Sequence, residues 1–189
     1  MEKITTDGFV IEYGKKTDDS EVLEGSVVGY EGWDKVVNVP AKFEVKDGDN
    51  VTEGTVTSIG IGAFENYIYL EKVNIPETVV SLGKFAFKKC SGLQYVNIPG
   101  TVESVPDYCF VECSSLETVE ISEGVKSIGD FAFSNCAKLN KAVIPSSCKS
   151  IGFSAFEHCK VLKNVEMPSG VKVDYFAFKD TRYEREIKK

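Results

Sequence analysis

The sequence predicts an α/β but β-rich solenoid, in which short parallel strands stack and short α-helical or 3₁₀ turns connect them. Three observations lead to this prediction. The segment "SIGDFAFSNC" (127–136) recurs at intervals of 23 residues. A second segment, such as "LQYVNIPGTV" (93–102), recurs with it and alternates apolar and polar residues as a strand does. One unit cannot bury its own apolar side chains, so the units are expected to stack.

The repeat unit reads S-I-G-x-x-A-F-x-x-C-x-x-L-x-x-V-x-I-P-x-x-V-x. Five full units run from about residue 58 to 171, and a partial sixth continues to 181. Other copies of the first segment lie at 58–67, 81–90, 104–113, 150–159 and, one residue early, 172–181. We therefore expect three parts, which are an N-terminal capping region (1–55), the repeat array (56–181) and a charged tail (182–189).

The L-x-x-V-x-I-P part of each unit is expected to form the first strand. In the second unit Val96 and Ile98 would point inward and Asn97 outward, because side chains alternate along a strand. The proline that follows lacks a backbone donor and suits the end of a strand. A second short extended piece then brings two further apolar residues inward, such as Val125 and Ile128.

The A-F-x-x-C part has apolar residues at helical spacing, and its length predicts a short α or 3₁₀ piece of about two turns. The glycine before this piece would permit a positive φ at the corner. The glycines concerned are Gly60, Gly83, Gly129 and Gly152. The phenylalanines of this part should form one aromatic ladder through the core, made of Phe64, Phe87, Phe110, Phe133, Phe156 and Phe178.

The two ends of a solenoid need covers, because open ends expose core and strand edges. Residues 1–55 are expected to form a β-rich cap, and Val37 and Val39 before Pro40 give a degenerate copy of the repeat strand. Trp33, the only tryptophan, is a candidate cover for the open end. The tail "TRYEREIKK" is expected to form a short capping helix or a frayed end.

All six cysteines occupy small apolar columns of the repeat. A catalytic thiol is needed once, so a cysteine repeated in every unit predicts a small buried core residue. Neighbouring units would bring cysteine Cα atoms to about 5 Å, so a bridge of the Cys90–Cys113 type remains an alternative to the free thiols that we expect. Four share one column, namely Cys90, Cys113, Cys136 and Cys159, while Cys109 replaces alanine and Cys148 replaces valine.

Other reactive residues fit a structural role better than catalysis. His158, the only histidine, lies in a variable column, which predicts a solvated imidazole and not a general base. The serine column is expected to bond turn backbone. The acidic turn with Asp47, Asp49 and Glu53 lacks the frame of a calcium loop, although a calcium site or a hidden active site there is an alternative. We expect no enzyme activity, no metal and no cofactor.

Charge and hydropathy exclude several classes of function. The net charge is −7, and residues 1–50 hold twelve acidic residues but only six lysines. This balance argues against binding nucleic acid or an anionic membrane. No apolar stretch approaches the roughly 18 residues of a membrane span. The first residues, "MEKITTDGFV", lack the form of a signal peptide, so the protein is expected to be either cytoplasmic or exported by a segment outside this sequence.

The unit "SIGDFAFSNCAKLNKAVIPSSCK" (127–149) resembles the BspA-like subclass of leucine-rich repeat proteins, and the resemblance covers about residues 58–181. The segment "GYEGWDKVVNVP" (29–40) is similar to the region that leads into such arrays. The resemblance implies a right-handed leucine-rich-repeat solenoid. It also implies a secreted or cell-surface protein of bacterial type that takes part in adhesion and protein binding.

A few residues depart from the pattern of this subclass. Such departures predict local distortion and altered end units, while the fold is retained. Ser122 replaces the proline, Tyr67 and Thr181 replace the cysteine, and Pro106 and Asp174 replace the glycine.

The candidate binding residues are the polar positions of the first strand. Stacked parallel strands display such positions as a flat or concave surface, which solenoids commonly use for binding. Tyr95 has the character of a binding hot spot. The two columns are Lys72, Tyr95, Thr118, Lys141 and Asn164, and Asn74, Asn97, Glu120, Val143 and Glu166. A merely solvated strand face is the alternative, and Tyr67, Tyr69 and Tyr108 form a second candidate patch on the turn side.

These observations predict a non-enzymatic module that binds a protein ligand, such as a host or matrix protein, through the polar strand face. A glycan ligand is less favoured, and neither nucleic-acid binding nor membrane insertion is expected. The main alternative is a structural spacer or scaffold repeat of a larger exported protein.

Overall fold

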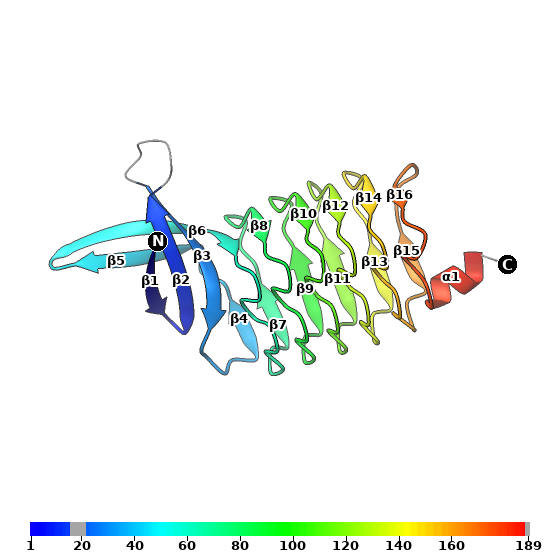
Figure 1. Ribbon diagram of the computed structural model, residues 1–189, viewed down its shortest axis with the longest axis horizontal. Coiled ribbons are helices and arrows are strands. Elements are labelled where there is room, and N and C mark those ends of the chain that lie inside the picture. Colours follow the sequence, from blue (N-terminus) through cyan, green and yellow to red (C-terminus); the bar gives the residue numbers. More distant parts are fainter. Residues whose placement is uncertain (16–21, 188–189) are drawn as a thin grey trace.

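The computed structural model describes residues 1–15 and 22–187. The molecule is elongated, with an N-terminal sheet at one end and a stack of about five coils that leads to a short helix at the other (Figure 1). Two parallel sheets run along the stack and enclose one continuous apolar core. The predicted solenoid of stacked parallel strands is therefore confirmed.

The N-terminal sheet has the strand order β1-β2-β3-β6-β5. Its strands are β1 (Glu2–Thr6), β2 (Phe9–Lys15), β3 (Leu23–Tyr30), β5 (Lys42–Asp47) and β6 (Asn50–Ile59). Neighbours pair antiparallel except β3 and β6, which are parallel. Phe9, Ile11 and Tyr13 alternate into the core, as expected for a strand with one buried face. The expected boundary at residues 55/56 falls inside β6, which belongs to both the N-terminal sheet and the array.

The larger sheet of the stack has the order β15-β13-β11-β9-β7-β4. Its strands are β4 (Val36–Asn38), β7 (Lys72–Asn74), β9 (Tyr95–Ile98), β11 (Thr118–Ile121), β13 (Lys141–Val143) and β15 (Asn164–Glu166). From β7 to β15 each paired residue faces its equivalent 23 positions on, so that Thr118 faces Tyr95 on one side and Lys141 on the other. Val37 pairs with Val73, which confirms the degenerate repeat strand predicted before Pro40.

The smaller sheet lies on the opposite side of the core. Its strands are β8 (Ser81–Leu82), β10 (Ser104–Val105), β12 (Ser127–Ile128), β14 (Ser150–Ile151) and β16 (Lys172–Val173). The ladder runs β10-β12-β14-β16, whereas β8 pairs with β6. Elsewhere the residue after the strand donates its N–H to the preceding coil, as Gly129 does to Val105 at 2.8 Å. Pro106 has no N–H to donate, so the distortion predicted there is confirmed, whereas Asp174 keeps this bond to Ile151 at 3.0 Å.

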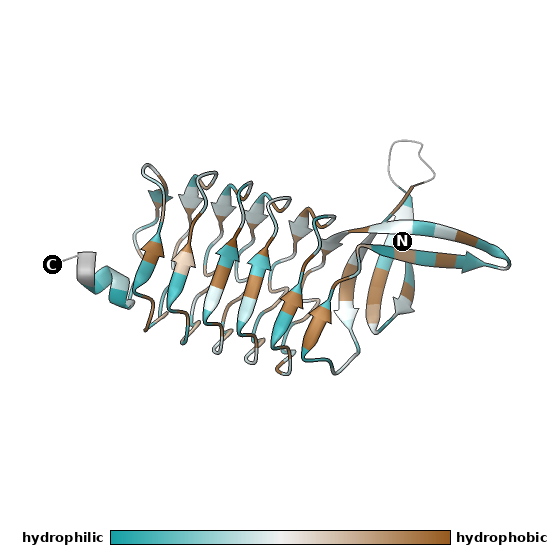
Figure 2. Cartoon of the chain, turned by 180° about the vertical axis from the view of Figure 1, so that it is seen from behind, coloured by the Kyte–Doolittle hydropathy of each residue, from teal (hydrophilic) through white to brown (hydrophobic). Residues whose placement is uncertain are grey.

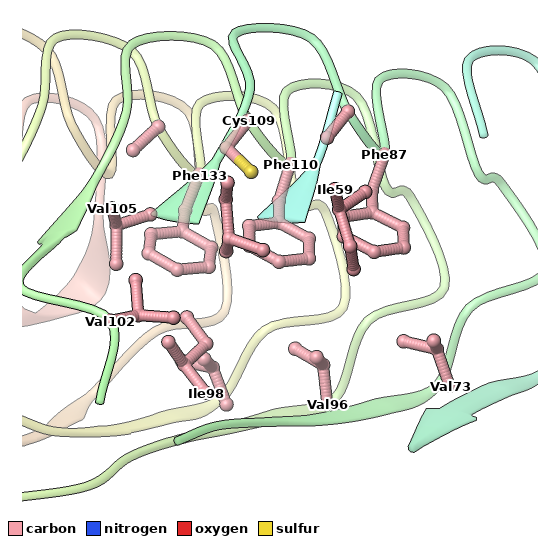
Figure 3. Close-up of a cluster of buried hydrophobic side chains, with 14 of the residues drawn as sticks. Ile59, Val73, Phe87, Val96, Ile98, Val102, Val105, Cys109, Phe110 and Phe133 are labelled. Carbon is pink, nitrogen blue, oxygen red and sulfur yellow. The ribbon is translucent and has the colours of Figure 1, made fainter. Parts of the chain in front are cut away.

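The predicted aromatic ladder is confirmed. Consecutive phenylalanine rings from Phe64 to Phe178 stack with centroids 5.0–5.2 Å apart and interplanar angles of 1–10°. Phe87, Phe110 and Phe133 lie in one row, with aliphatic side chains from both sheets packed against them (Figure 3). Repetition at one period therefore places the same side chain in the same environment in every coil.

The cysteines are buried in this core, as the repeat predicted. The thiols are free. In the shared column each Sγ donates to the phenylalanine carbonyl of the preceding coil, as Cys90 does to Phe64 at 3.1 Å and Cys113 to Phe87 at 3.1 Å. Burial raises the pKa of the Cys90 thiol to about 12 and that of Cys136 well above its ordinary value. Such thiols are poor nucleophiles, because the thiolate is the reactive form.

The predicted α or 3₁₀ pieces are replaced by consecutive hydrogen-bonded turns, which corrects the α/β part of the expected class. The N–H of Lys88 donates to Phe85 within the turn at 3.0 Å, whereas that of Phe87 donates to Cys109 of the next coil at 2.9 Å. Phe85 and Lys89 adopt the left-handed conformation, with φ of 61° and 58°. In a helix the N–H groups bond within the segment and φ is negative, so neither the bond to the next coil nor the left-handed residues would occur.

The glycines before these turns serve a different purpose from the one expected. Gly60, Gly83, Gly129 and Gly152 are not among the residues with positive φ, so the freedom that the sequence suggested is not used. A Cβ on Gly83 would lie 2.4 Å from the backbone carbon of Gly60, and one on Gly129 would lie 2.7 Å from the backbone nitrogen of Asp107. The glycine is therefore needed because adjacent coils approach too closely for a side chain.

The C-terminal tail forms α1 (Arg182–Ile187), and residues 188–189 of the expected tail lie outside the described residues. Thr181 caps this helix by accepting the N–H of Glu184 at 3.0 Å, and Glu184 accepts the N–H of Asp180 at 3.0 Å. This pair is a variant of the capping box, because Glu184 bonds the N–H of the residue before the cap and not that of Thr181 itself. Thr181 replaces the cysteine of the repeat, and Tyr183 packs on Phe178 of the aromatic ladder at 5.1 Å. Across the described residues, α1 is the only helix, and nothing there has the length and apolar character of a membrane-spanning helix.

Candidate binding surface

The register of the larger sheet assembles the ten predicted binding residues into two parallel columns, which we call the strand face. In the first column each residue pairs with the next, in the order Lys72, Tyr95, Thr118, Lys141 and Asn164. The second follows Asn97, Glu120, Val143 and Glu166, with Asn74 at its N-terminal end. Polar and apolar residues alternate along these strands (Figure 2), so the polar set faces away from the core.

Contacts across the strands hold Tyr95 in place on this face. Its hydroxyl donates to Glu120 Oε2 at 2.7 Å, and Lys72 Nζ lies 5.7 Å from the centre of its ring. The hydrogen bond to Glu120 raises the pKa of Tyr95, and partial burial adds to the effect. An aromatic ring fixed in this way loses less freedom when a partner binds.

The middle of the second column contains a shallow depression of about 330 Å³, lined in part by Asn97, Glu120 and Val143. Ser122 lies at its edge and donates to Asn97 Oδ1 at 3.2 Å. Ser122 replaces the proline of other units, and its hydroxyl gives this coil a polar group that proline lacks. Beside the depression, Lys141 and Glu166 form an ion pair at 3.1 Å.

Two residues of the strand face were not among those predicted. Val36 and Asn38 of β4 continue the two columns, because they pair with Lys72 and Asn74. Asn74 Nδ2 donates to Asn38 Oδ1 at 2.6 Å, and the Val36 side chain is half exposed. The sequence signal is the segment "VVNVP" (36–40), in which positions 36 and 38 match the outward positions of the repeat strand.

His158 and its neighbouring cysteine lie in different environments. The imidazole is partly exposed, and its Nδ1 lies 3.0 Å from Asp180 Oδ2. Cys159 is fully buried and donates from Sγ to Phe133 at 3.1 Å. The two side chains therefore cannot act as a nucleophile and base in one open site.

The serine column forms hydroxyl contacts between coils. Ser127 Oγ donates to Ser104 Oγ at 2.9 Å, so this pair differs from the expected bond to turn backbone. The two serines come directly opposite each other in the parallel ladder of the smaller sheet. Coil-to-coil register, and not the local turn, therefore decides which partner these hydroxyls meet.

The acidic residues of the N-terminal region are spread along the β5–β6 hairpin. Asp47 pairs with Asn50 next to the turn, whereas Glu53 lies opposite Glu44 and contacts Lys42 Nζ at 2.6 Å. Within residues 1–15 and 22–187, no three His, Cys, Asp or Glu side chains converge in a way that could hold a metal ion. The calcium alternative therefore has no converging set of ligands among the described residues. A cavity of about 530 Å³ adjoins this hairpin and is lined in part by Val45 and Thr52, but Asp47, Asp49 and Glu53 are not among its lining residues.

The three tyrosines of the second candidate patch do not form one surface. Tyr108 stacks with Phe131 at 4.9 Å, and Tyr67 is partly buried against the core. Tyr69 is exposed and lies beside Trp33, with ring centroids 5.7 Å apart. The expectation that Trp33 covers the open end was wrong, because β4 continues the larger sheet there and leaves Trp33 at the surface.

A 23-residue period, two parallel sheets and a stacked phenylalanine ladder define a leucine-rich-repeat solenoid. A family model described as "BspA type Leucine rich repeat region" matches residues 57–185 in six copies. The chain therefore belongs to the BspA-type leucine-rich repeat family.

Solved structures of bacterial leucine-rich repeat proteins share this fold. One from Bacteroides ovatus is 32% identical with a TM-score of 0.73, over 87% of this chain and 41% of its own. The Treponema pallidum protein TpLRR is 27% identical with a TM-score of 0.71, over 88% of this chain and 72% of its own. One from Eubacterium ventriosum is 25% identical with a TM-score of 0.68, over 85% of this chain and 48% of its own.

The chain spans less than half the length of the Bacteroides ovatus structure that it matches. No curated protein shows significant similarity to it.

Proposed function

We propose that this chain is a non-enzymatic module that binds a partner protein through the strand face. The observation that carries the proposal is the in-register display of polar residues on an exposed sheet, with Tyr95 held at its centre by Lys72 and Glu120. Leucine-rich repeat solenoids commonly use extended surfaces of this kind for interaction. A fixed tyrosine is also among the residue types that dominate binding energy.

The composition of the strand face favours a protein over other ligands. It combines an aromatic ring, amide side chains and two charges of each sign, which can complement the mixed surface of a folded protein. The net charge of −7 opposes nucleic acid. A host or matrix protein is the partner that we propose, and a glycan is less favoured on this face.

We further propose that the protein is secreted or displayed on the cell surface and acts in adhesion. The support is the resemblance of its repeats to the BspA type, since binding of external proteins requires an external location. Surface proteolysis of intact cells, followed by immunodetection of this chain, tests the location. Protection of the chain in intact cells, together with digestion after lysis, would contradict it.

Residues 1–55 act in this proposal as the N-terminal cap of the array that extends over residues 56–181. β4 pairs with β7 and β6 pairs with β8, so the edges of the first coil in both sheets are covered. The helix α1 in the tail plays the corresponding part at the other end, where Tyr183 packs on Phe178. Covered edges also protect the array from pairing with other chains.

A structural spacer within a larger exported protein is the second candidate function. The observation that favours it is the internal pairing of the charged groups on the strand face, such as Lys141 with Glu166. A surface whose ions satisfy one another needs no partner, as on an ordinary solvated sheet. The two functions differ in whether substitutions on the strand face change binding.

The test is capture of purified extracellular matrix and plasma proteins by the immobilised chain. Tyr95→Ala and Lys141→Glu should each weaken capture, with a loss of about 2 kcal/mol, or roughly 30-fold, for a hot-spot tyrosine. Tyr175→Ala and Lys149→Glu are matched controls, because both residues are exposed and lie outside the strand face. Capture that is unchanged in both strand-face variants would overturn the proposed face, and no capture at all would favour the spacer.

A further inference from the structure

The loop between β3 and β4 carries an exposed tryptophan, Trp33, which pairs with Tyr69 to form what we call the aromatic platform. The Trp33 side chain is 78% exposed and that of Tyr69 is 50% exposed, with centroids 5.7 Å apart and an interplanar angle of 59°. A tryptophan side chain contributes a large apolar area, so leaving it in water forgoes the stabilisation that burial would give. The strand face does not use either ring.

The loop is held firmly although its tryptophan is exposed. Tyr67 donates from its hydroxyl to the carbonyl of Asp34 at 2.9 Å, and Tyr30 donates to the Asp34 carboxylate. The carbonyl of Lys35 accepts the N–H of Glu71 at 2.7 Å, and the two side chains form an ion pair at 2.8 Å. These bonds fix the backbone next to Trp33, so the platform is ordered before any ligand arrives.

A furrow of about 510 Å³ begins beside the platform and crosses four coils. Its first coil contributes Ile68, which directly precedes Tyr69, and its last contributes Asn135. The β3–β4 loop lies along the same edge of the molecule as the turns that precede β7, β9 and β11 (Figure 1). The platform and the furrow therefore lie along the same edge of the molecule, and Ile68 of the furrow adjoins Tyr69 of the platform in the chain.

The polar lining of the furrow is regularly spaced. Asn66, Lys89, Glu112 and Asn135 are equivalent positions of successive coils, and all four adopt the left-handed conformation with φ of 58–62°. Parallel strands are about 4.8 Å apart, so these side chains project at short and equal intervals. A ligand with a repeating pattern of hydrogen-bonding groups would match such a row.

The side chains that line the furrow suit a neutral, polyhydroxylated ligand. Lys89 and Glu112 lie 3.9 Å apart and offset each other's charge. Asn66 and Asn135 can both donate and accept hydrogen bonds, as can the two serines of the lining. The apolar contribution is confined to Ile68 and the adjoining platform, where the C–H face of a sugar ring can lie against an aromatic ring.

We propose that the platform and furrow form a second binding site, which takes a neutral oligosaccharide. One sugar ring stacks on Trp33 and Tyr69, and the hydroxyls of the following sugars bond to the Asn66–Asn135 row. A polyanionic ligand would need a surplus of cations, which the paired Lys89 and Glu112 do not provide. This site shares no residue with the strand face. Substitutions that abolish protein binding at the strand face should therefore leave sugar binding at the platform and furrow unchanged.

Trp33 supplies the readout, because it is the only tryptophan of the chain. Its emission would be followed during titration with neutral tetrasaccharides of β-1,4-glucose, α-1,4-glucose, β-1,4-N-acetylglucosamine and α-1,6-mannose. At least one should shift or quench the emission to saturation, with a Kd between about 10 μM and 1 mM, as expected for a shallow open site. A panel that leaves the emission unchanged would overturn the proposal.

Substitutions then locate the bound sugar. Tyr69→Ala and Asn135→Ala should each weaken binding by about tenfold, which equals about 1.4 kcal/mol. Tyr95→Ala is the matched control and should leave sugar binding unchanged. Calorimetric titration of Trp33→Ala should show no sugar binding, whereas Trp33→Phe should keep part of it. Sugar binding that survives Trp33→Ala, or capture of a protein partner that is lost in Trp33→Ala but not in Tyr95→Ala, would overturn the assignment.

Discussion

Two junctions between coils of the same array are held together differently. At the regular junction, β12 and β14 pair, and Gly152 donates to Ile128 at 2.8 Å. At the irregular junction, β8 and β10 do not pair, and Pro106 stands where Gly152 stands in the regular one. A depression of about 550 Å³ opens there between Leu82 and Pro106.

The packing of the core is nearly the same at the two junctions. Across the irregular junction Phe87 and Phe110 stack at 5.0 Å and 1°, and across the regular one Phe133 and Phe156 stack at 5.2 Å and 10°. The backbone ladder of the smaller sheet is therefore dispensable at one step, while the buried rings continue through it. At this step the coils are held by the buried rings, by the β9–β11 pairing of the larger sheet and by turn bonds such as that of the Phe87 N–H to Cys109, so the ladder of the smaller sheet is not required for cohesion.

The largest effect that tests this comparison is the loss of a ladder phenylalanine on each side. Phe110→Ala at the irregular junction and Phe133→Ala at a regular one should each lower the free energy of unfolding by about 3–5 kcal/mol. Both rings are fully buried, so both changes leave a cavity. Urea unfolding followed by circular dichroism measures the difference. A loss below about 1 kcal/mol for Phe110→Ala alone would show that the core is also interrupted there.

A second test adds a side chain where coils approach most closely. A Cβ at residue 129 would lie 2.6 Å from Asp107 Oδ1 and 2.7 Å from its nitrogen. Gly129→Ala should therefore cost about 1–3 kcal/mol by overpacking. Ala137→Ser serves as the neutral reference, because Ala137 lies on an exposed turn where a hydroxyl meets solvent. Equal unfolding midpoints for Gly129→Ala and the wild type would contradict the close-approach explanation.

A third change should restore the missing donor. Pro106→Gly returns an N–H at the irregular junction, which can bond to the Leu82 carbonyl as Gly129 bonds to Val105. The hydrogen bond contributes about 0.5–1.5 kcal/mol, and the freedom of glycine opposes it by about 0.5–1 kcal/mol. The stability change should therefore stay within about 1 kcal/mol. Amide hydrogen exchange is the sharper measurement, and rapid exchange at residue 106 would mean that the coils remain apart.

The smallest expected effect concerns a carboxylate that bridges two coils. Glu123 accepts the N–H of Ser146 at 2.8 Å and the N–H of Ser147 at 3.1 Å, and these bonds lower its pKa. A carboxyl whose pKa is lower in the folded chain stabilises it above the unfolded pKa, and this contribution is lost as pH falls through the folded value. The midpoint of urea unfolding should thus decline less between about pH 5 and pH 3 in Glu123→Gln than in the wild type. Unfolding curves recorded at intervals of about one pH unit measure this difference. Parallel curves for the two proteins would remove Glu123 from the pH response.

Features that depend on periodicity could be predicted from the amino-acid order. Residues 23 apart occupy equivalent places in a stack, so the Phe133 ladder, the Cys136 column and the two columns of the strand face followed from alignment of the units. The broken bond at Pro106 was also predictable, because proline has no N–H in any fold.

Features that depend on how close one coil comes to the next emerged only from the packed chain. The turn around Phe85 gives its N–H groups to a neighbouring coil, so local helical spacing misled the prediction. Glycine is needed at Gly83 because a Cβ there would lie 2.4 Å from the backbone of Gly60 in the adjacent coil. No local sequence pattern shows this distance. Trp33 stayed exposed because β4 joined the larger sheet beside it. Periodicity states which residues are equivalent, whereas distances between separate coils arise only when the chain packs against itself.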